Sequence, residues 1–358
     1  KSKYKSYISN MKKSMVSNVF NFPAHTEQEG DKKVSYSQYT MWANCPKQWK
    51  LNYMEGHKDF DPSIHLVFGT AMHETIQSWL QVMYNQSAVE AESMDLNQIL
   101  LEEMGKEYQS MVERYGKFTN KSEMNEFYQD GIQILDYLRK HRAEYFSVKK
   151  MRLLGVELPI YYPTEINENI MMKGFLDLVF EVVSDGSIEI WDIKTSTKGW
   201  NAYQKKDKTK TAQLVLYKKF FSKQYGYPIE KIQVRYFIVK RKLWEEAMFA
   251  QKRVQDFVPA HGSITMRNVS NSFDDFISKS FLEDGSYNTE GEFPATAGKN
   301  SKNCKWCPFK KSELCNKKDR IKEQCMKKGL LLLSVPVILL TSSTFIIPKE
   351  IDLSCLDV

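Results

Sequence analysis

Hydrophobic residues recur every three or four positions between residues 35 and 146, which is the spacing of amphipathic helices. The spacing predicts three helical stretches, at residues 35–53, 69–86 and 92–146. Ser35 or Ser37 can cap the first of them, because a serine side chain accepts a hydrogen bond from the unpaired N–H groups at a helix start. The third stretch is expected to form one or two helices, with Gly116 as the break.

After residue 150 the pattern changes to alternating apolar and polar positions, which is typical of half-buried strands. Strands are predicted at residues 152–161, 170–182, 187–194, 232–240 and 244–250, with a helix at 209–225. Asp185-Gly186 marks a tight hairpin between the second and third strands. This order of elements predicts an α/β core with a helical insertion ahead of it.

Composition indicates a globular protein and leaves a nucleic-acid partner open. The 358 residues are 42% hydrophobic and 27% charged, close to the usual balance of a soluble domain. Lysine and arginine exceed the acidic residues by 51 to 44, and the formal net charge of +7 permits a polyanionic partner without requiring one. No secretory signal is visible after Lys1-Ser2-Lys3, so we expect a reducing, cytoplasmic compartment.

The two ends of the chain differ from the rest. Residues 1–34 are polar and lysine-rich without a sustained period, and we interpret them as a basic flexible arm. Residues 326–358 form an apolar tail that contains the run Leu330–Leu340, interrupted by Pro336. Since a membrane span needs about 20 mostly apolar residues, a membrane anchor is not favoured and the role of the tail stays open.

Three charged side chains lie inside predicted strands that are otherwise apolar. Asp177 lies in the second predicted strand, and Asp192 and Lys194 lie in the third. Residues two apart on a strand point to the same face, and the hairpin brings the two strands together, so the three groups can converge. Charged groups among apolar residues are costly unless they pair or bind a cation.

Two carboxylates and an ammonium group around one point suit the hydrolysis of a phosphodiester. Carboxylate oxygens bind Mg²⁺ or Mn²⁺, which stabilises the charge that develops on the phosphoryl oxygens and activates a water molecule. Lys194 can position that water or stabilise the same charge. An ordinary salt bridge is the alternative for an isolated Asp-x-Lys, and only further elements in the right order count against it.

Two further elements flank this group in the sequence. His73 is predicted in the first turn of the second helix, four residues after Gly69, where an imidazole can complete a manganese site beside carboxylates. Gln213 and Tyr217 lie four apart on one face of a later helix and can orient the lysine or contact a phosphate. A surface histidine and a partly buried helix face are the plain structural alternatives.

In this order the four elements resemble the PD-(D/E)XK nuclease superfamily, in its RecB-like branch, over about residues 35–315. The pattern of the branch is G-x-x-x-H, then G-x-x-D, then D-x-K, then Q-x-x-x-Y. The matching residues are Gly69 and His73, Gly174 and Asp177, Asp192 and Lys194, and Gln213 and Tyr217. Glu157 also falls where these proteins often have a glutamate.

The resemblance implies a restriction-endonuclease-like α/β fold, in which helices flank a central mixed sheet. It implies a Mg²⁺- or Mn²⁺-dependent deoxyribonuclease that acts as an exonuclease on single strands or ends of DNA. The implied metal ligands are His73, Asp177, Asp192 and the carbonyl of Ile193. Lys194 is the implied base-like catalytic residue, with Gln213 and Tyr217 beside it. The alternative is a non-catalytic DNA-binding module, and the intact acidic residues and lysine argue against it.

Four cysteines form a second candidate site. Cys304 and Cys307 form a C-x-x-C motif, Cys315 follows, and Cys45 lies far upstream in the first predicted helix. Tetrahedral thiolate ligation suits zinc or an iron–sulfur cluster, and the ligand types exclude neither.

The same arrangement, one cysteine near the N-terminus and three near the C-terminus, resembles the iron–sulfur nucleases of this branch. AddB and the CRISPR-associated RecB-like exonucleases are examples, although the last gap is longer in this chain. The resemblance implies a structural 4Fe–4S cluster, with zinc as the alternative. Cys325 and Cys355 are interpreted as free thiols.

Nucleic acid is expected beside the catalytic strand. The candidate contacts are Lys205, Lys206, Lys208 and Lys210, in a predicted loop, and the ring of Trp200. A solvated lysine loop is the alternative. Protein partners in a recombination, repair or genome-processing complex are compatible with such an enzyme.

Three regions are therefore predicted. They are an arm at 1–34, a nuclease domain at 35–325 and a tail at 326–358. Within the domain, the helical part is expected at about 69–150, the catalytic α/β core at about 151–250 and the cysteine region at 299–316.

Overall fold

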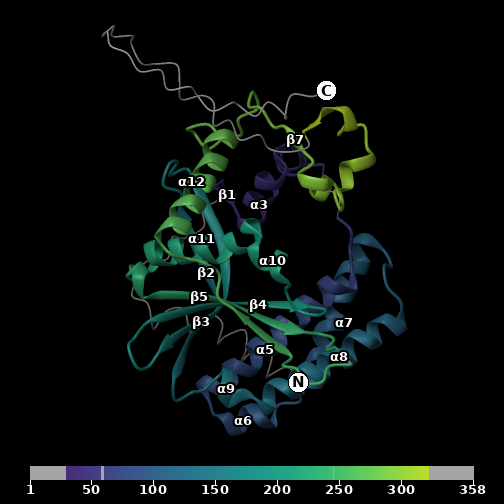
Figure 1. The fold of residues 1–358 in the computed structure, drawn as a ribbon, viewed down its shortest axis with the longest axis vertical. Helices are drawn as coiled ribbons and strands as arrows, with labels where there is room; N and C mark the ends of the chain where they lie inside the picture. Colours follow the sequence, from purple (N-terminus) through teal and green to yellow (C-terminus); the bar gives the residue numbers. More distant parts are fainter. Residues whose placement is uncertain (1–29, 58–59, 245, 322–358) are drawn as a thin grey trace, which may run out of the picture.

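A six-stranded mixed sheet with helices on both faces organises the protein (Figure 1). The computed structural model describes residues 30–57, 60–244 and 246–321. The predicted apolar tail, the two cysteines interpreted as free thiols and most of the predicted arm lie outside the described residues.

Strand β3 (Ile170–Val182) is the centre of the sheet. Strand β2 (Met151–Pro163) runs antiparallel along one edge of β3 over its whole length. Because a strand has only two edges, the other edge is shared by β1 (Lys32–Val34), which is parallel, and β4 (Ile188–Ser196), which is antiparallel. Residues 32–34 thus belong to the sheet, which corrects their assignment to the flexible arm.

The two strands that share this edge do not meet. β1 pairs with residues 170–172 of β3, and β4 pairs with residues 178–181. In the part of the chain that the structure describes, no strand lies beside residues 173–177 on this edge. The sheet therefore has an opening in the stretch that ends at Asp177.

Beyond β4 the sheet continues with β5 (Ile232–Lys240), which is parallel, and β6 (Val254–Phe257), which is antiparallel. The strand predicted at 244–250 is wrong. Among the described residues there, Trp244, Met248 and Phe249 are 60%, 88% and 83% exposed, so their side chains find no core to pack against. The segment is a loop, and the edge strand follows it.

A helical layer covers one face of the sheet. Its members are α5 (Ile64–Asn85), α6 (Ala88–Ser93), α7 (Leu96–Tyr115), α8 (Lys121–Lys140) and α9 (Arg142–Tyr145). Gly116 ends α7 with a φ of 77°, which confirms the predicted break. Helix α5 begins at Ile64, because this residue and Val67 are buried. His73 consequently lies in the third turn of the helix, and its predicted place in the first turn is wrong.

A second helical layer covers the opposite face. It contains α3 (Tyr36–Asn44), α4 (Pro46–Trp49), the π-helix η1 (Lys50–Met54), α11 (Lys208–Tyr225) and α12 (Ser263–Ser280). Ser35 caps α3 as expected, accepting a hydrogen bond from the backbone N–H of Gln38 at 3.3 Å. The single helix predicted at 35–53 is broken at Cys45, because the residue before a proline disfavours helical backbone angles.

Short elements complete the described chain. They are α10 (Ala202–Lys206), η2 (Ile229–Lys231), β7 (Ala295–Thr296), η3 (Lys299–Cys304), η4 (Pro308–Lys311), η5 (Lys317–Asp319) and β8 (Arg320–Ile321). Helix α10 stands where a loop was predicted between β4 and α11. None of the helices in the described ranges is long and apolar enough to cross a membrane.

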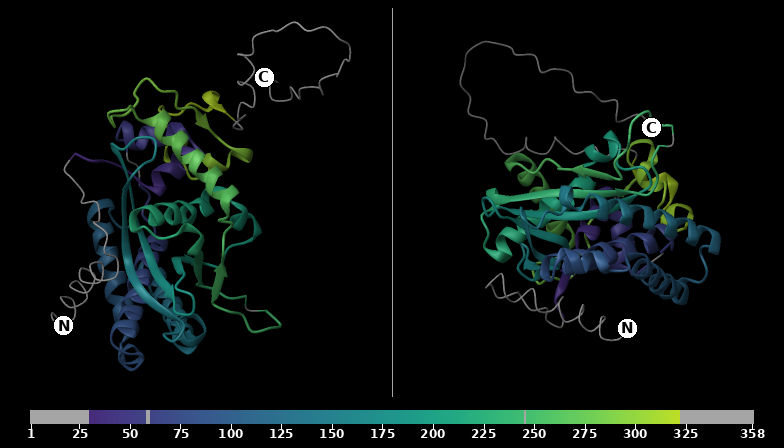
Figure 2. Two further views of the ribbon diagram at one scale, coloured as in Figure 1. Left: turned by 90° about the vertical axis from the view of Figure 1, so that its left-hand side faces the viewer. Right: turned by 90° about the horizontal axis from the view of Figure 1, so that it is seen from below.

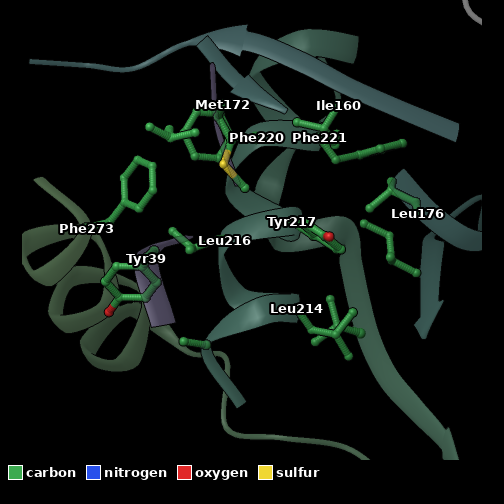
Figure 3. Close-up of a cluster of buried hydrophobic side chains, with 14 of the residues drawn as sticks. Tyr39, Ile160, Met172, Leu176, Leu214, Leu216, Tyr217, Phe220, Phe221 and Phe273 are labelled. Atoms are coloured by element: carbon green, nitrogen blue, oxygen red, sulfur yellow. The ribbon is translucent and has the colours of Figure 1, made fainter. Parts of the chain in front are cut away.

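Figure 2 shows the two helical layers on either side of the sheet. Two hydrophobic clusters, one on each face of the sheet, hold these layers together. Figure 3 shows part of the cluster around α11, where Leu214 and Phe221 lie toward the strands and Leu216 lies toward Tyr39 and Phe273. The ring of Tyr39, from α3, meets Phe273 of α12 at 5.6 Å between centroids. Both faces of the sheet are therefore covered by buried apolar side chains. The polar groups at the opening lie in apolar surroundings, where burial of a polar group is costly.

Candidate active site

The opening beside β3 gathers the three charged residues predicted from the sequence. The β3–β4 ladder ends with Leu178 opposite Trp191, so Asp177 and Asp192 come directly after the last paired residues. The backbone N–H of Ile193 donates to Asp177 Oδ2 at 2.8 Å. A carboxylate thus satisfies an N–H group beyond the end of the ladder, and the two strands separate around the site.

Lys194 lies on the same side of β4 as Asp192. Its Nζ is 2.7 Å from Asp192 Oδ2, and Asp192 is only 2% exposed. Apart from this ion pair, Asp192 Oδ2 is buried without a hydrogen bond. A buried carboxylate oxygen with a single cationic neighbour is an atom to which a metal ion can bind.

Helix α5 brings His73 to the opposite side of this group. Its Nδ1 lies 3.4 Å from Asp177 Oδ2, and the ring also hydrogen-bonds to the backbone of Ile193. The helix packs across β2, β3 and β4, which fixes the imidazole against the strand ends. All four ligand positions predicted from the resemblance are therefore brought together.

Gln77 and Glu157 extend the site, and Gln77 was missed by the sequence analysis. Gln77 is fully buried, and its Nε2 donates to Glu157 Oε1 at 2.7 Å and to the Asp177 carbonyl at 3.2 Å. Glu157 lies on β2, opposite Asp177 in the register, with a φ of 51° in the left-handed region that β-strand residues avoid. The available signal for Gln77 was its place one helical turn after His73.

Helix α11 contributes Gln213 and Tyr217, which lie one turn apart as predicted. Gln213 Nε2 is 3.5 Å from the Tyr217 hydroxyl. The Tyr217 ring packs on Gly174 so closely that a Cβ there would stand 2.9 Å from Tyr217 Cε1. Glycine is thus required at this place in the G-x-x-D element, because any side chain would displace the tyrosine.

A pocket of about 520 Å³ fills the opening. Its lining includes the catalytic candidates Asp177, Asp192, Lys194, Gln213 and Tyr217, together with Lys33, Lys173 and residues 34–38. Tyr36, at the start of α3, was not predicted as a site residue. Its hydroxyl donates to the carbonyl of Thr209, which ties α3 to the start of α11 across the pocket.

The four predicted nucleic-acid lysines lie outside this pocket. Lys205 and Lys210 rest over aromatic rings, at 5.5 Å from the Phe257 centroid and 5.3 Å from the Trp200 centroid. Lys206 and Lys208 are exposed. The Trp200 ring is partly buried against Tyr236, with centroids 4.8 Å apart. The lysines that line the pocket are instead Lys33, Lys173 and Lys194.

Comparison with known proteins identifies the family of the chain. The family model of the PD-(D/E)XK nuclease superfamily matches residues 33–315. The chain belongs to this superfamily. None of the curated proteins compared matches the chain. Among solved structures, one described as "Crystal structure of SSO0001" is similar at 11% identity, with 85% of this chain and 94% of that chain covered and a TM-score of 0.31.

Membership of the PD-(D/E)XK superfamily accounts for the architecture and bounds the chemistry. The mixed sheet flanked by helices is the restriction-endonuclease-like fold predicted from the sequence. The superfamily implies a metal-dependent nuclease that acts on DNA, and its members typically use Mg²⁺ or Mn²⁺.

The types of donor atom at the opening suit such a cation, but in this structure the side chains do not surround a metal position. Within the described ranges, no group of three or more histidine, cysteine, aspartate or glutamate side chains is spaced to hold a metal ion. Two carboxylates and a backbone carbonyl are hard oxygen donors, and a neutral imidazole suits manganese. In this arrangement the Lys194 ammonium group, rather than a metal ion, contacts Asp192 Oδ2.

Burial acts on the pKa of both aspartates, of His73 and of Lys194. It raises the pKa of Asp177 from an ordinary 3.8 to about 7 and that of Asp192 to about 6, with Lys194 opposing both shifts. Burial and the Lys194 charge lower the pKa of His73, which favours the neutral, metal-binding imidazole. Burial also opposes the charge of Lys194, but Asp192 and Asp177 more than offset it and its pKa is raised.

The shift at Asp177 predicts a pH-dependent stability of the metal-free protein. The folded protein holds a proton on this carboxyl between about pH 4 and pH 7 that the unfolded chain releases, so stability falls as the pH rises through this window. Asp177→Asn should remove about 2–4 kcal/mol of this loss. We expect thermal melting without added metal to show a flatter profile from pH 4 to pH 8 than the parent.

Asp136→Asn, the same change at an exposed position on α8, is the matched control and should follow the parent. A parallel profile for Asp177→Asn and the parent would show that this carboxyl does not carry the effect.

The four predicted cysteine ligands converge at the other end of α3. All four are free thiols, Cys45 buried and the others partly buried. Burial raises the pKa of Cys45 and of Cys307. The charges of Cys304 and Cys315 raise the pKa of both thiols further, and that of Cys45 also acts on Cys307, so the four thiols lie in one region. Cys45 Sγ accepts a hydrogen bond from the Thr296 N–H at 3.4 Å, which joins the N-terminal helices to the C-terminal segment.

Proposed function

We propose that the protein is a Mg²⁺- or Mn²⁺-dependent deoxyribonuclease, in which Asp177, Asp192 and Lys194 form the hydrolytic centre and DNA is degraded from its ends. The carrying observation is the convergence of these three groups at the strand opening, where Lys194 Nζ and Asp192 Oδ2 are 2.7 Å apart. Superfamily membership supports the reaction class.

His73, Asp177, Asp192 and the Ile193 carbonyl would hold the cation, which supplies a charge for the phosphoryl oxygens and a more acidic bound water. Gln77 holds the backbone of Asp177 and the carboxylate of Glu157 with one amide group. The β3 backbone that carries the proposed metal ligand Asp177 is therefore held in place before any substrate binds.

Lys194 acts as a cation in this proposal. Its raised pKa keeps the ammonium protonated at neutral pH, and the ion pair with Asp192 fixes its position. A protonated amine can donate hydrogen bonds to an attacking water and to a phosphoryl oxygen that gains charge. Tyr217, whose pKa burial raises to about 12, stays a neutral hydroxyl beside the same pocket.

Action from DNA ends is tested with a circular substrate. Linear and circular single strands of the same sequence are incubated with the protein and Mn²⁺. An exonuclease degrades the linear strand and leaves the circle intact, and end labels give the polarity. Nicking of the circle at a comparable rate would contradict the exonuclease assignment while leaving the nuclease assignment in place.

The four-cysteine site is proposed to hold a 4Fe–4S cluster, as in the RecB-like branch, and to join both ends of the domain. The electrostatic coupling of Cys307 to Cys45, Cys304 and Cys315 supports this proposal. The thiols would have to draw together around the cluster, because in the described residues they are not spaced to hold a metal ion. Anaerobically purified protein should contain about four iron atoms per chain. One zinc and no iron would contradict the cluster.

Cys45→Ser is expected to lower the melting temperature by about 5 °C or more, because the ligand bonds close a loop of more than 250 residues. The melting temperature and the bound metal are measured on the same preparation. Cys355→Ser is the control and should keep both values. An unchanged melting temperature in Cys45→Ser would remove the structural role.

A further inference from the structure

A second concave surface lies beside the cysteine segment. It has a volume of about 770 Å³ and is bounded on one side by Gln48 and Asn52, from α4 and η1. On the other side lie Lys305, Trp306, Lys310 and Lys311 of the cysteine segment, and Phe60 and Asp61 complete the rim. We call this surface the lysine–tryptophan groove.

The segment that forms the groove is strongly basic. Residues 299–318 contain seven lysines and one acidic residue, Glu313, and all seven lysines are exposed. Cations concentrated on one short segment produce a positive potential that attracts a polyanion. Neither metal ligation by the cysteines nor core packing requires this charge, because the lysine side chains point into solvent.

Trp306 is the second unusual feature of the groove. Its side chain is 84% exposed, although a tryptophan is normally among the more buried residues. Lys305 Nζ lies 5.1 Å from its ring centroid, so the ring stands among the cations. An exposed aromatic ring flanked by lysines is the arrangement with which single-strand binding proteins stack bases and hold phosphates.

The groove and the active-site pocket are neighbours along one face of α3. Gln38 lines the active-site pocket, and Met41 lines the groove. The two residues are three apart in the helix, which places them on the same face about 4.5 Å apart along the axis. A flexible strand that lies in the groove can therefore continue into the pocket.

We propose that the lysine–tryptophan groove binds a single-stranded segment of the DNA next to the scissile bond. Trp306 stacks on a base, and Lys305, Lys310 and Lys311 contact phosphates. Base faces are free for stacking only where the strand is unpaired, which favours a single strand over a continuous duplex. The inference rests on the proposed nuclease function for the direction of the strand, but binding itself can be measured without cleavage.

The test is fluorescence anisotropy with a labelled 20-nucleotide single strand and no added divalent metal. Trp306→Ala should weaken binding by about 5- to 100-fold, and Trp306→Phe should recover part of the loss. Lys310→Ala/Lys311→Ala should make the negative slope of log affinity against log salt concentration shallower by about 1.4, because two phosphate contacts are lost. Lys149→Ala/Lys150→Ala, another adjacent pair of exposed lysines, should leave the slope unchanged.

Three outcomes would overturn the proposal that the lysine–tryptophan groove binds a single strand. They are parental affinity in Trp306→Ala, an equal change of slope for the two lysine pairs, and an equal Trp306→Ala loss on a blunt duplex. Because the Trp306 side chain is exposed, its removal should leave the melting temperature unchanged. If the groove variants cleave DNA and bind single strands normally, the groove proposal fails and the nuclease proposal stands. If binding depends on the groove but the parent does not cleave, the nuclease proposal fails and the groove proposal stands.

Discussion

Asp192→Asn is expected to reduce DNA cleavage by on the order of 10³-fold or more and to remove most of the affinity for Mn²⁺. Asp192 is nearly fully buried, and its Oδ2 forms an ion pair with Lys194 but no further hydrogen bond within the described residues. An amide has almost the same shape but carries no charge, so the site would hold fewer negative charges for the cation. The loss should therefore appear in binding as well as in rate.

Calorimetric titration with Mn²⁺ and a cleavage assay on the same preparation check this expectation. Asp136→Asn serves again as the matched control, since it makes the same chemical change at an exposed position. Parental Mn²⁺ affinity in Asp192→Asn would mean that this carboxylate is not a metal ligand, even if cleavage is lost.

Lys194→Met is expected to separate chemistry from metal binding. Cleavage should fall by about 10²- to 10³-fold, because a buried cation that faces the developing charge is lost. Affinity for Mn²⁺ should be retained or increased, because the ammonium group no longer competes for Asp192 Oδ2 at 2.7 Å. Lys194→Arg keeps the charge and should recover part of the rate. A loss of Mn²⁺ affinity in Lys194→Met would indicate a structural role for the lysine.

The strands that carry the candidate catalytic residues were predictable because the pattern that defines them is local. Asp192 and Lys194 are two residues apart on one strand, and a short loop at residues 183–187, which contains Asp185-Gly186, joins that strand to the one with Asp177. Strand parity and a turn dipeptide therefore suffice to bring the three groups together. The helix that carries Gln213 and Tyr217 comes after the short helix α10, and its spacing is equally local.

The surroundings of these residues depend on contacts between distant segments, which a periodic pattern does not encode. β1 pairs with residues of β3 that are more than 130 positions away, and this pairing places Tyr36 over the opening. Gln77 reaches Glu157 across 80 positions. The loop with Trp244 has the alternation of a strand, but nothing in the sequence shows that its side chains stay exposed.

Glycine 174 illustrates what the structure adds to a motif. In the sequence it is a letter of the pattern G-x-x-D, three positions before Asp177. In the fold the Tyr217 ring packs directly on this glycine, so closely that a Cβ atom would clash with the ring. The second and last elements of the motif set are thereby joined in one packing contact.

The most direct test of the central claim is cleavage of end-labelled single- and double-stranded DNA by anaerobically purified protein with Mn²⁺, beside Asp192→Asn and Lys194→Met. The account predicts products from the parent in the presence of the metal, none without it, and a loss of about 10²-fold or more in both variants. Binding without cleavage by the parent, or cleavage by the variants at the parental rate, would contradict a hydrolytic centre at Asp177, Asp192 and Lys194.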